Sequence, residues 1–126
     1  MSCQFCDIQK SEDKILENDH FFSHYDGFPV SKGHSLIISR CHVDSFFDLS
    51  KEEVQSMYDL IKKTKEIIQK KFNPDGYNIG INEGKTAGQT VFHLHIHLIP
   101  RYKGDVVNPT GGVRNIFPDK ADYTKS

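Results

Sequence analysis

Apolar and polar residues alternate along several short stretches of the chain, and such alternation predicts β-strands whose two faces differ. A turn rich in glycine and proline, residues 26–33, separates the second stretch from the third. Pro100 is expected to end the last stretch, because proline has no backbone N–H to donate. The predicted strands are residues 14–17, 20–25, 34–39, 77–82 and 91–99.

Between the third and fourth predicted strands, apolar residues recur at the spacing of an amphipathic helix. Ser50 and Glu53 form a capping box, in which each side chain bonds a free backbone amide of the first turn. Pro74 is expected to end this helix just after Asn73. The stripe predicted to face the core is Val54, Met57, Ile61, Ile68 and Phe72.

These elements predict an α+β domain with about five mainly antiparallel strands, one long helix and one short helix. At 126 residues the whole chain, 1–126, is expected to form a single domain. The tail, residues 106–126, shows little periodicity and is the least defined part of that domain.

Composition and charge exclude several classes of function. Sixteen Lys and Arg against seventeen Asp and Glu give a net charge of −1, so no overall field would recruit nucleic acid. No apolar run approaches the about 20 residues of a membrane span, and the first residues lack the basic and apolar segments of a signal peptide. Three cysteines, two of them in a Cys-x-x-Cys, favour a reducing compartment, the cytoplasm, with thiols free or bound to metal.

Three histidines in strict alternation carry most of the chemical information. On a strand His93, His95 and His97 would share one face, with the apolar residues between them directed to the core. Because an imidazole titrates near neutral pH, each could serve as a base, a nucleophile or a metal ligand.

Three interpretations of this histidine row remain open on the residues alone. The first is a set of partly exposed histidines without chemistry. The second is a zinc hydrolase, although side chains spread over roughly 13 Å along a strand rarely meet on one ion. In the third, the middle imidazole attacks phosphorus and water later cleaves the covalent intermediate, with backbone amides of the preceding glycine loop holding the phosphate oxygens.

The run Ala-Gly-Gln-Thr-Val-Phe-His-Leu-His-Ile-His-Leu-Ile-Pro-Arg, residues 87–101, resembles the signature of the histidine triad (HIT) family. Its first four residues and its Pro-Arg end resemble the branch that hydrolyses dinucleoside polyphosphates. The resemblance covers about residues 3–105 and implies a homodimer with the histidine triad fold. It also implies hydrolysis of nucleoside-5′-phosphate derivatives, such as dinucleoside polyphosphates or nucleoside phosphoramidates, at the α-phosphorus. The product would be a nucleoside monophosphate, released from a nucleotidyl-histidine.

The resemblance further implies roles for single residues. His95 would be the nucleophile, and its other nitrogen should donate to a backbone carbonyl so that the attacking nitrogen is free. Asp26 would accept from the ribose hydroxyls, a role that suits a carboxylate because it only accepts. The residues implied to contact the phosphate or the leaving group are His97, Gln89 and Thr90, and Asn82 would hold the ribose–phosphate region. Gly88 and His34 are further residues expected to bind the substrate. Those implied for the nucleobase slot are Phe5, Ile8 and His24, for which plain apolar packing is an equal alternative.

Cys3 and Cys6 have the spacing of metal ligands. A redox pair is the other interpretation, but that motif normally follows a strand, and none precedes residue 3. Some bacterial members of the resembled family, and related uridylyltransferases, place such a pair with two histidines around structural zinc. The corresponding residues here are His42 and His93. Cys41 is interpreted as a plain small residue, with a ligand role as the minor alternative.

The expected partner is a purine nucleotide that contains adenosine, and no organic cofactor is expected. A nucleotide-binding regulatory protein with incidental hydrolysis is the alternative from a different class of function.

Overall fold

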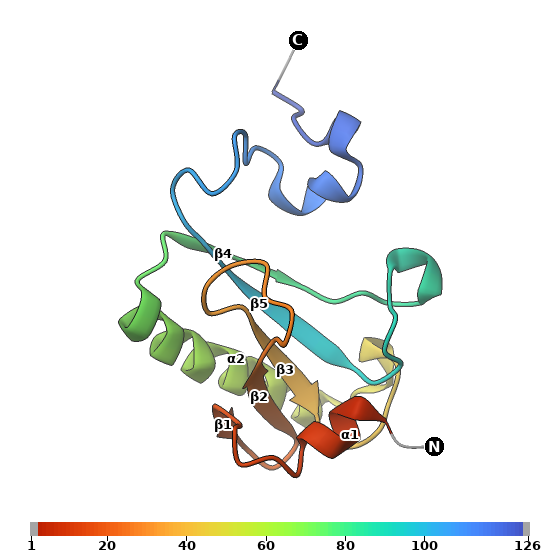
Figure 1. Ribbon diagram of the computed structural model, residues 1–126. Coiled ribbons are helices and arrows are strands. Elements are labelled where there is room, and N and C mark those ends of the chain that lie inside the picture. Colours follow the sequence, from red (N-terminus) through yellow and green to blue (C-terminus); the bar gives the residue numbers. More distant parts are fainter. Residues whose placement is uncertain (1–2, 125–126) are drawn as a thin grey trace.

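The computed structural model describes residues 3–124 as one antiparallel sheet with a long helix along one of its faces (Figure 1). The strand order is β1-β2-β3-β5-β4, so β5 has a neighbour on both sides. This confirms the predicted α+β fold with five antiparallel strands. The strands are β1 (Leu16–Glu17), β2 (Phe21–Tyr25), β3 (Ser35–Ser39), β4 (Gly76–Gly80) and β5 (His95–Arg101), and the α-helices are α1 (Gln4–Ile8) and α2 (Lys51–Phe72).

The long helix α2 begins and ends as the sequence predicts. Both hydrogen bonds of the capping box are present between Ser50 and Glu53. Asn73 ends the helix in the left-handed conformation, with φ of 52°. Met57 and Ile68 of the predicted stripe are buried against the sheet, and so is Leu60. Burial of such side chains stabilises the fold by about 1.5–3 kcal/mol each.

The two faces of strand β5 carry different side chains, apolar ones toward the core and histidines on the other side. Ile96 and Leu98 are buried on the side of α2, whereas His95 and His97 lie on the opposite face. The other predicted strands are present with shorter or shifted ends, as β4 covers residues 76–80 instead of 77–82. Strand ends depend on partners that the sequence does not show.

Two predictions about β5 are wrong. The strand begins at His95, not at residue 91, so His93 lies outside the ladder. It also continues through Pro100 to Arg101. The Pro100 carbonyl accepts from Ser31 Oγ, which shows that its nitrogen also points to the β3 side. Because β3 has already ended there, opposite Leu98, the missing N–H removes no ladder bond.

The C-terminal segment lies beyond the β4 edge of the sheet (Figure 1). It forms two short 3-10 helices, Gly112–Ile116 and Pro118–Lys120, in place of α-helix or strand. Several of its apolar side chains are exposed, namely Val106, Val107, Val113, Ile116, Phe117 and Tyr123. Within residues 3–124, no helix is both long and apolar enough to cross a membrane.

Candidate functional site

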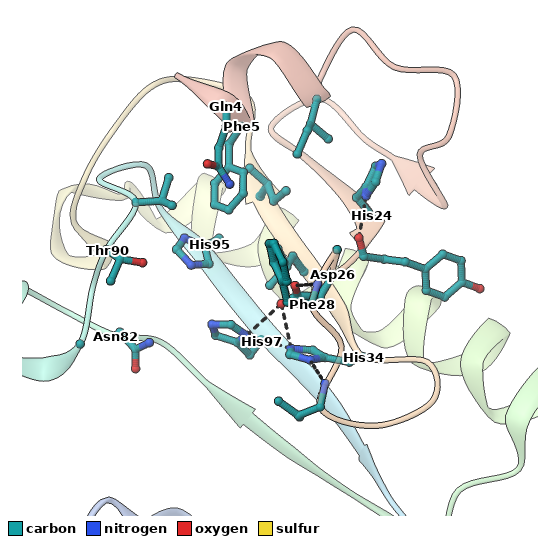
Figure 2. A pocket seen from close by; sticks show the side chains of 18 residues that line it. Gln4, Phe5, His24, Asp26, Phe28, His34, Asn82, Thr90, His95 and His97 are labelled. Atoms are coloured by element: carbon teal, nitrogen blue, oxygen red, sulfur yellow. Dashed lines mark hydrogen bonds and ion pairs between the residues drawn. The ribbon is translucent and has the colours of Figure 1, made fainter. Parts of the chain in front are cut away.

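A cavity of about 670 Å³ opens on the sheet face opposite α2 (Figure 2). Its volume is in the range of small-ligand sites. Six parts of the chain form it: α1, β2, the turn between β2 and β3, β3, the loop before β5, and β5 itself. Eight residues named from the sequence for substrate contacts line it together with both strand histidines: Phe5, Ile8, His24, Asp26, His34, Asn82, Gly88 and Thr90.

His95 has the arrangement expected of a nucleophilic imidazole. Its Nδ1 lies 2.8 Å from the backbone oxygen of His93, which can only accept, so Nδ1 carries the hydrogen. The lone pair is therefore on Nε2. The Phe5 ring packs edge-on against the imidazole with centroids 4.7 Å apart and restricts its rotation.

A second hydrogen-bond chain fixes the form of His97. The backbone N–H of Val30 donates to His34 Nδ1 over 3.1 Å, so the hydrogen of the neutral His34 ring is on Nε2. That Nε2 lies 3.0 Å from His97 Nδ1 and 3.3 Å from Asp26 Oδ2, and it can donate to both (Figure 2). His97 Nδ1 then accepts, which leaves the hydrogen of His97 on Nε2.

Burial keeps the imidazoles of His34 and His97 uncharged at neutral pH. Desolvation, together with the neighbouring imidazoles of His95 and His34, lowers the pKa of His97 to about 4, against a smaller opposing effect of Asp26. Desolvation also lowers the pKa of His34, again opposed by Asp26. Neutral His97 therefore offers an N–H donor next to His95.

The four residues predicted to bind zinc come together at the N-terminal end of the fold. Cys3 Sγ and Cys6 Sγ lie 3.4 and 3.5 Å from His93 Nδ1, and His42 Nδ1 lies 3.1 Å from the same atom. Ligands about 2.0–2.3 Å from a tetrahedral zinc are separated by about 3.3–3.8 Å, close to the separations of these donors, so the four residues fit this ion. Cys41 is exposed and is not in this group.

The three histidines of the row therefore do not share one task. His93 is fully buried, and its Nε2 donates to the Ser39 carbonyl over 2.6 Å while Nδ1 faces the cysteines. His97 instead belongs to a group with Asp26 and His34. The structure thus does not place the three imidazoles around one ion, as the zinc-hydrolase interpretation would require.

Gln89 lies behind the loop instead of lining the cavity. Its Oε1 accepts from the Gly84 N–H over 2.9 Å, and its Nε2 lies 3.1 Å from the Asp44 carbonyl. Nε2 also lies 3.3 Å from the carbonyl of Val91. The amide is thus engaged within the protein, where it holds the loop that carries Gly88 and Thr90 in place. Gly88 has φ of 98°, a conformation that favours glycine.

Some cavity residues were not predicted from the sequence. Leu36 and Ile38 of β3 form part of the floor, and Phe28 and Val30 lie on the turn between β2 and β3. Phe28 had a usable signal, since it is a large apolar residue two positions after Asp26 in a turn. The backbone groups that fix the histidine tautomers leave no signal in the sequence.

The sequence and fold have clear counterparts among known proteins. The family description "HIT domain" matches residues 8–104. An uncharacterised HIT-like protein of Methanocaldococcus jannaschii is 38% identical over 94% of both chains. The crystal structure of a Zn-bound histidine triad family protein from Mycobacterium smegmatis has a TM-score of 0.75 and 36% identity, covering 86% of this chain and 81% of that one.

Hydrolases are among the similar proteins. An adenylylsulfatase of Arabidopsis thaliana is 36% identical over 82% of this chain and 54% of its own length. A bis(5'-adenosyl)-triphosphatase of Dictyostelium discoideum is 41% identical over 64% of this chain and 54% of its own. The matched range and these identities show that the chain belongs to the histidine triad (HIT) family, several members of which are named as nucleotide hydrolases.

Proposed function

We propose that the protein hydrolyses nucleoside-5′-phosphate derivatives at the α-phosphorus through a covalent intermediate on His95, and releases a nucleoside monophosphate. The observation that carries the proposal is the hydrogen bond from His95 Nδ1 to the His93 carbonyl, which leaves Nε2 as the attacking nitrogen at a cavity large enough for a nucleotide. The similar triphosphatase and adenylylsulfatase support dinucleoside polyphosphates and other adenosine-containing nucleotides as substrates.

The cavity lining supports one orientation of the nucleotide. The nucleobase would lie against the apolar wall formed by Phe5 and Ile8, with His24 at its edge. Asp26 would accept from the ribose hydroxyls, since a carboxylate has lone pairs beyond those that its own contacts use. Asn82, Gly88 and Thr90 would lie around the phosphates, and Gln89 would hold their loop.

In the first step, His95 Nε2 forms a bond to the α-phosphorus while the bond to the leaving oxygen breaks. The leaving oxygen gains negative charge and accepts a hydrogen bond from His97 Nε2–H, which the hydrogen-bond chain through His34 directs toward it. The proton stays on His97, because a neutral imidazole that gave it up would become an anion, and the leaving group departs with its negative charge. In the second step, water attacks the phosphorus, the P–N bond breaks and the proton that the water loses passes to the solvent. His95 then has its starting form again.

The N-terminal donor group supports structural zinc, held by Cys3, Cys6, His42 and His93. When bound, the ion would supply cross-linking of the chain and no chemistry of the reaction. Phe5 lies between the two cysteines, so the same cross-link would fix the wall of the nucleobase slot.

A homodimer in the cytoplasm completes the proposal. The edge strand β4 and the exposed apolar side chains of the C-terminal segment are surfaces that a second copy could cover. Sedimentation at micromolar concentration should give twice 14.4 kDa. The three free cysteines agree with a reducing compartment.

A turnover assay on a panel of dinucleoside polyphosphates and nucleoside phosphoramidates tests the proposed function. His95→Asn keeps a polar side chain but removes the nucleophile, so turnover should fall by about 10⁴-fold or more while nucleotide affinity changes little. A protein that binds nucleotides but turns over none of the panel would instead fit the regulatory alternative.

A further inference from the structure

The ring of Phe28 lies where it contributes little to the stability of the fold. It is 91% exposed, and it lies at the cavity on the turn between β2 and β3. In the view of Figure 2 the ring is seen between His95 and Asp26. Leaving such a side chain in water forgoes the favourable free energy of burying it, which a ligand that covers the ring would recover.

The backbone of this turn is held at several points, so the ring is presented from a fixed base. The Phe28 N–H donates to Asp26 Oδ1 over 2.8 Å. Further along the turn, Ser31 Oγ donates to the Pro100 carbonyl over 2.7 Å, and Tyr102 donates to the carbonyl of Lys32 over 2.6 Å. A group presented in this way loses little conformational freedom when a ligand packs against it.

The cavity wall provides the complementary surface. Phe5, Leu36 and Ile38 form a buried apolar cluster that lines the same cavity. A flat nucleobase lying on that cluster would have one face covered and its other face open. Asp26 accepts the Phe28 N–H, so the carboxylate proposed for the ribose also sets the position of the ring.

We infer that Phe28 stacks on the outer face of the nucleobase and makes the site selective for substrates that carry a base. The inference rests on the proposed function, because it requires a nucleotide in this cavity. Stacking is tolerant of base identity, since every base has a π-face, so Phe28 would select for a base over none and not for one base over another.

The test compares two ligands that differ only in the base. Binding of adenosine 5′-monophosphate and of ribose 5-phosphate is measured calorimetrically for the wild type, Phe28→Ala and Phe47→Ala. Base stacking of about 1–3 kcal/mol predicts that Phe28→Ala weakens the monophosphate about 5- to 150-fold and leaves ribose 5-phosphate unchanged. Phe47 is the matched control, because it is 78% exposed and does not line the cavity.

The outcomes distinguish a failure of the stacking inference from a failure of the proposed function on which it rests. If the wild type binds no nucleoside monophosphate, the proposed function fails first. If both proteins bind the monophosphate equally, or if Phe28→Ala weakens both ligands alike, the stacking inference is overturned. Sedimentation of Phe28→Ala should match the wild type; a changed mass would show that the ring serves contact between copies. An unchanged melting temperature is expected for so exposed a residue.

Discussion

Two clusters of histidine with cysteine or aspartate lie close together in this fold, and they differ in what they can bind. The first holds Cys3, Cys6, His42 and His93, and the second holds Asp26, His34 and His97; within each, the ligand atoms lie within 4.8 Å of one another. The separations in the second cluster, 3.0, 3.3 and 4.0 Å, place its atoms on a circle of radius about 2.0 Å, close to a zinc–nitrogen bond length. By distance alone both clusters suit a metal.

The two clusters differ in the hydrogen bond made by the ring nitrogen that faces away from the cluster, on His93 in the first and on His34 in the second. This bond decides whether the other ring nitrogen has a lone pair for a metal. His93 Nε2 donates to the Ser39 carbonyl, so its Nδ1 has a lone pair for an ion. His34 Nδ1 instead accepts the Val30 N–H, so its Nε2 carries hydrogen and cannot bind an ion while that bond remains. Two similar clusters of histidine thus suit different tasks, a metal ion in the first and a hydrogen-bond chain in the second.

Metal content is the prediction with the largest expected effect. Protein purified without chelators should contain about one zinc per chain by elemental analysis, and Cys6→Ser should contain none, because a tetrahedral site loses a ligand. Unfolding by urea should show that this loss lowers the free energy of unfolding by several kcal/mol, on the order of the folding contribution of structural zinc. Cys41→Ser is the control and should keep both zinc and stability, since Cys41 is exposed and outside the donor group.

A zinc content other than one per chain would contradict the difference drawn between the two clusters. A second equivalent of zinc that disappears in His97→Asn would show that the Asp26 cluster also binds metal. The absence of any metal in the wild type would instead remove the zinc proposal.

The next effect concerns the chain from Val30 to His97. His34→Phe keeps a ring of similar size but cannot donate to His97 Nδ1, so His97 Nε2–H is no longer held as the donor to the leaving oxygen. Turnover should fall about 10²–10³-fold, the usual cost of losing one hydrogen-bond donor to a developing charge. His34→Gln retains a donor and should recover part of the rate. Nitrogen-15 NMR of His97 should show hydrogen on Nε2 in the wild type and a mixture of tautomers in His34→Phe. An unchanged tautomer in that variant would limit His34 to packing.

The smallest effect is a pH dependence of stability. The pKa of His97 is lowered to about 4 in the folded protein, against about 6.5 when unfolded, so its contribution is fully present above 6.5. As the pH falls from 6.5 toward 4, the unfolded chain binds a proton at this position that the folded protein does not, and stability is lost.

Urea unfolding at pH 7 and pH 5 measures this loss. The wild type should lose about 2 kcal/mol more than His97→Asn over this interval, since the variant has no imidazole to protonate at this position. Equal losses in the two proteins would mean that His97 titrates normally in the fold.

Much of this arrangement follows from local sequence rules. The Ser50 capping box and the alternation of Ile96 and Leu98 with the strand histidines are short-range patterns, and the structure has both. Local patterns do not predict the orientation of the His93 ring, because the Ser39 carbonyl and cysteines about 90 residues away set it. Gln89 was expected to contact the phosphate because of the family resemblance. Its side chain instead bonds backbone groups of Gly84 and Asp44, and these contacts depend on the conformation of the loop, which the sequence does not show.

The central claim is that His95 carries the nucleotide during turnover, and rapid-quench mass spectrometry tests it most directly. Wild-type protein mixed with a dinucleoside polyphosphate and quenched within milliseconds should show the added mass of a nucleoside monophosphate on the peptide that contains His95. The adduct should be acid-labile, because a phosphoramidate is hydrolysed in acid, and it should be absent from His95→Asn. Normal turnover with no adduct on His95, or near-normal turnover by His95→Asn, would contradict the account.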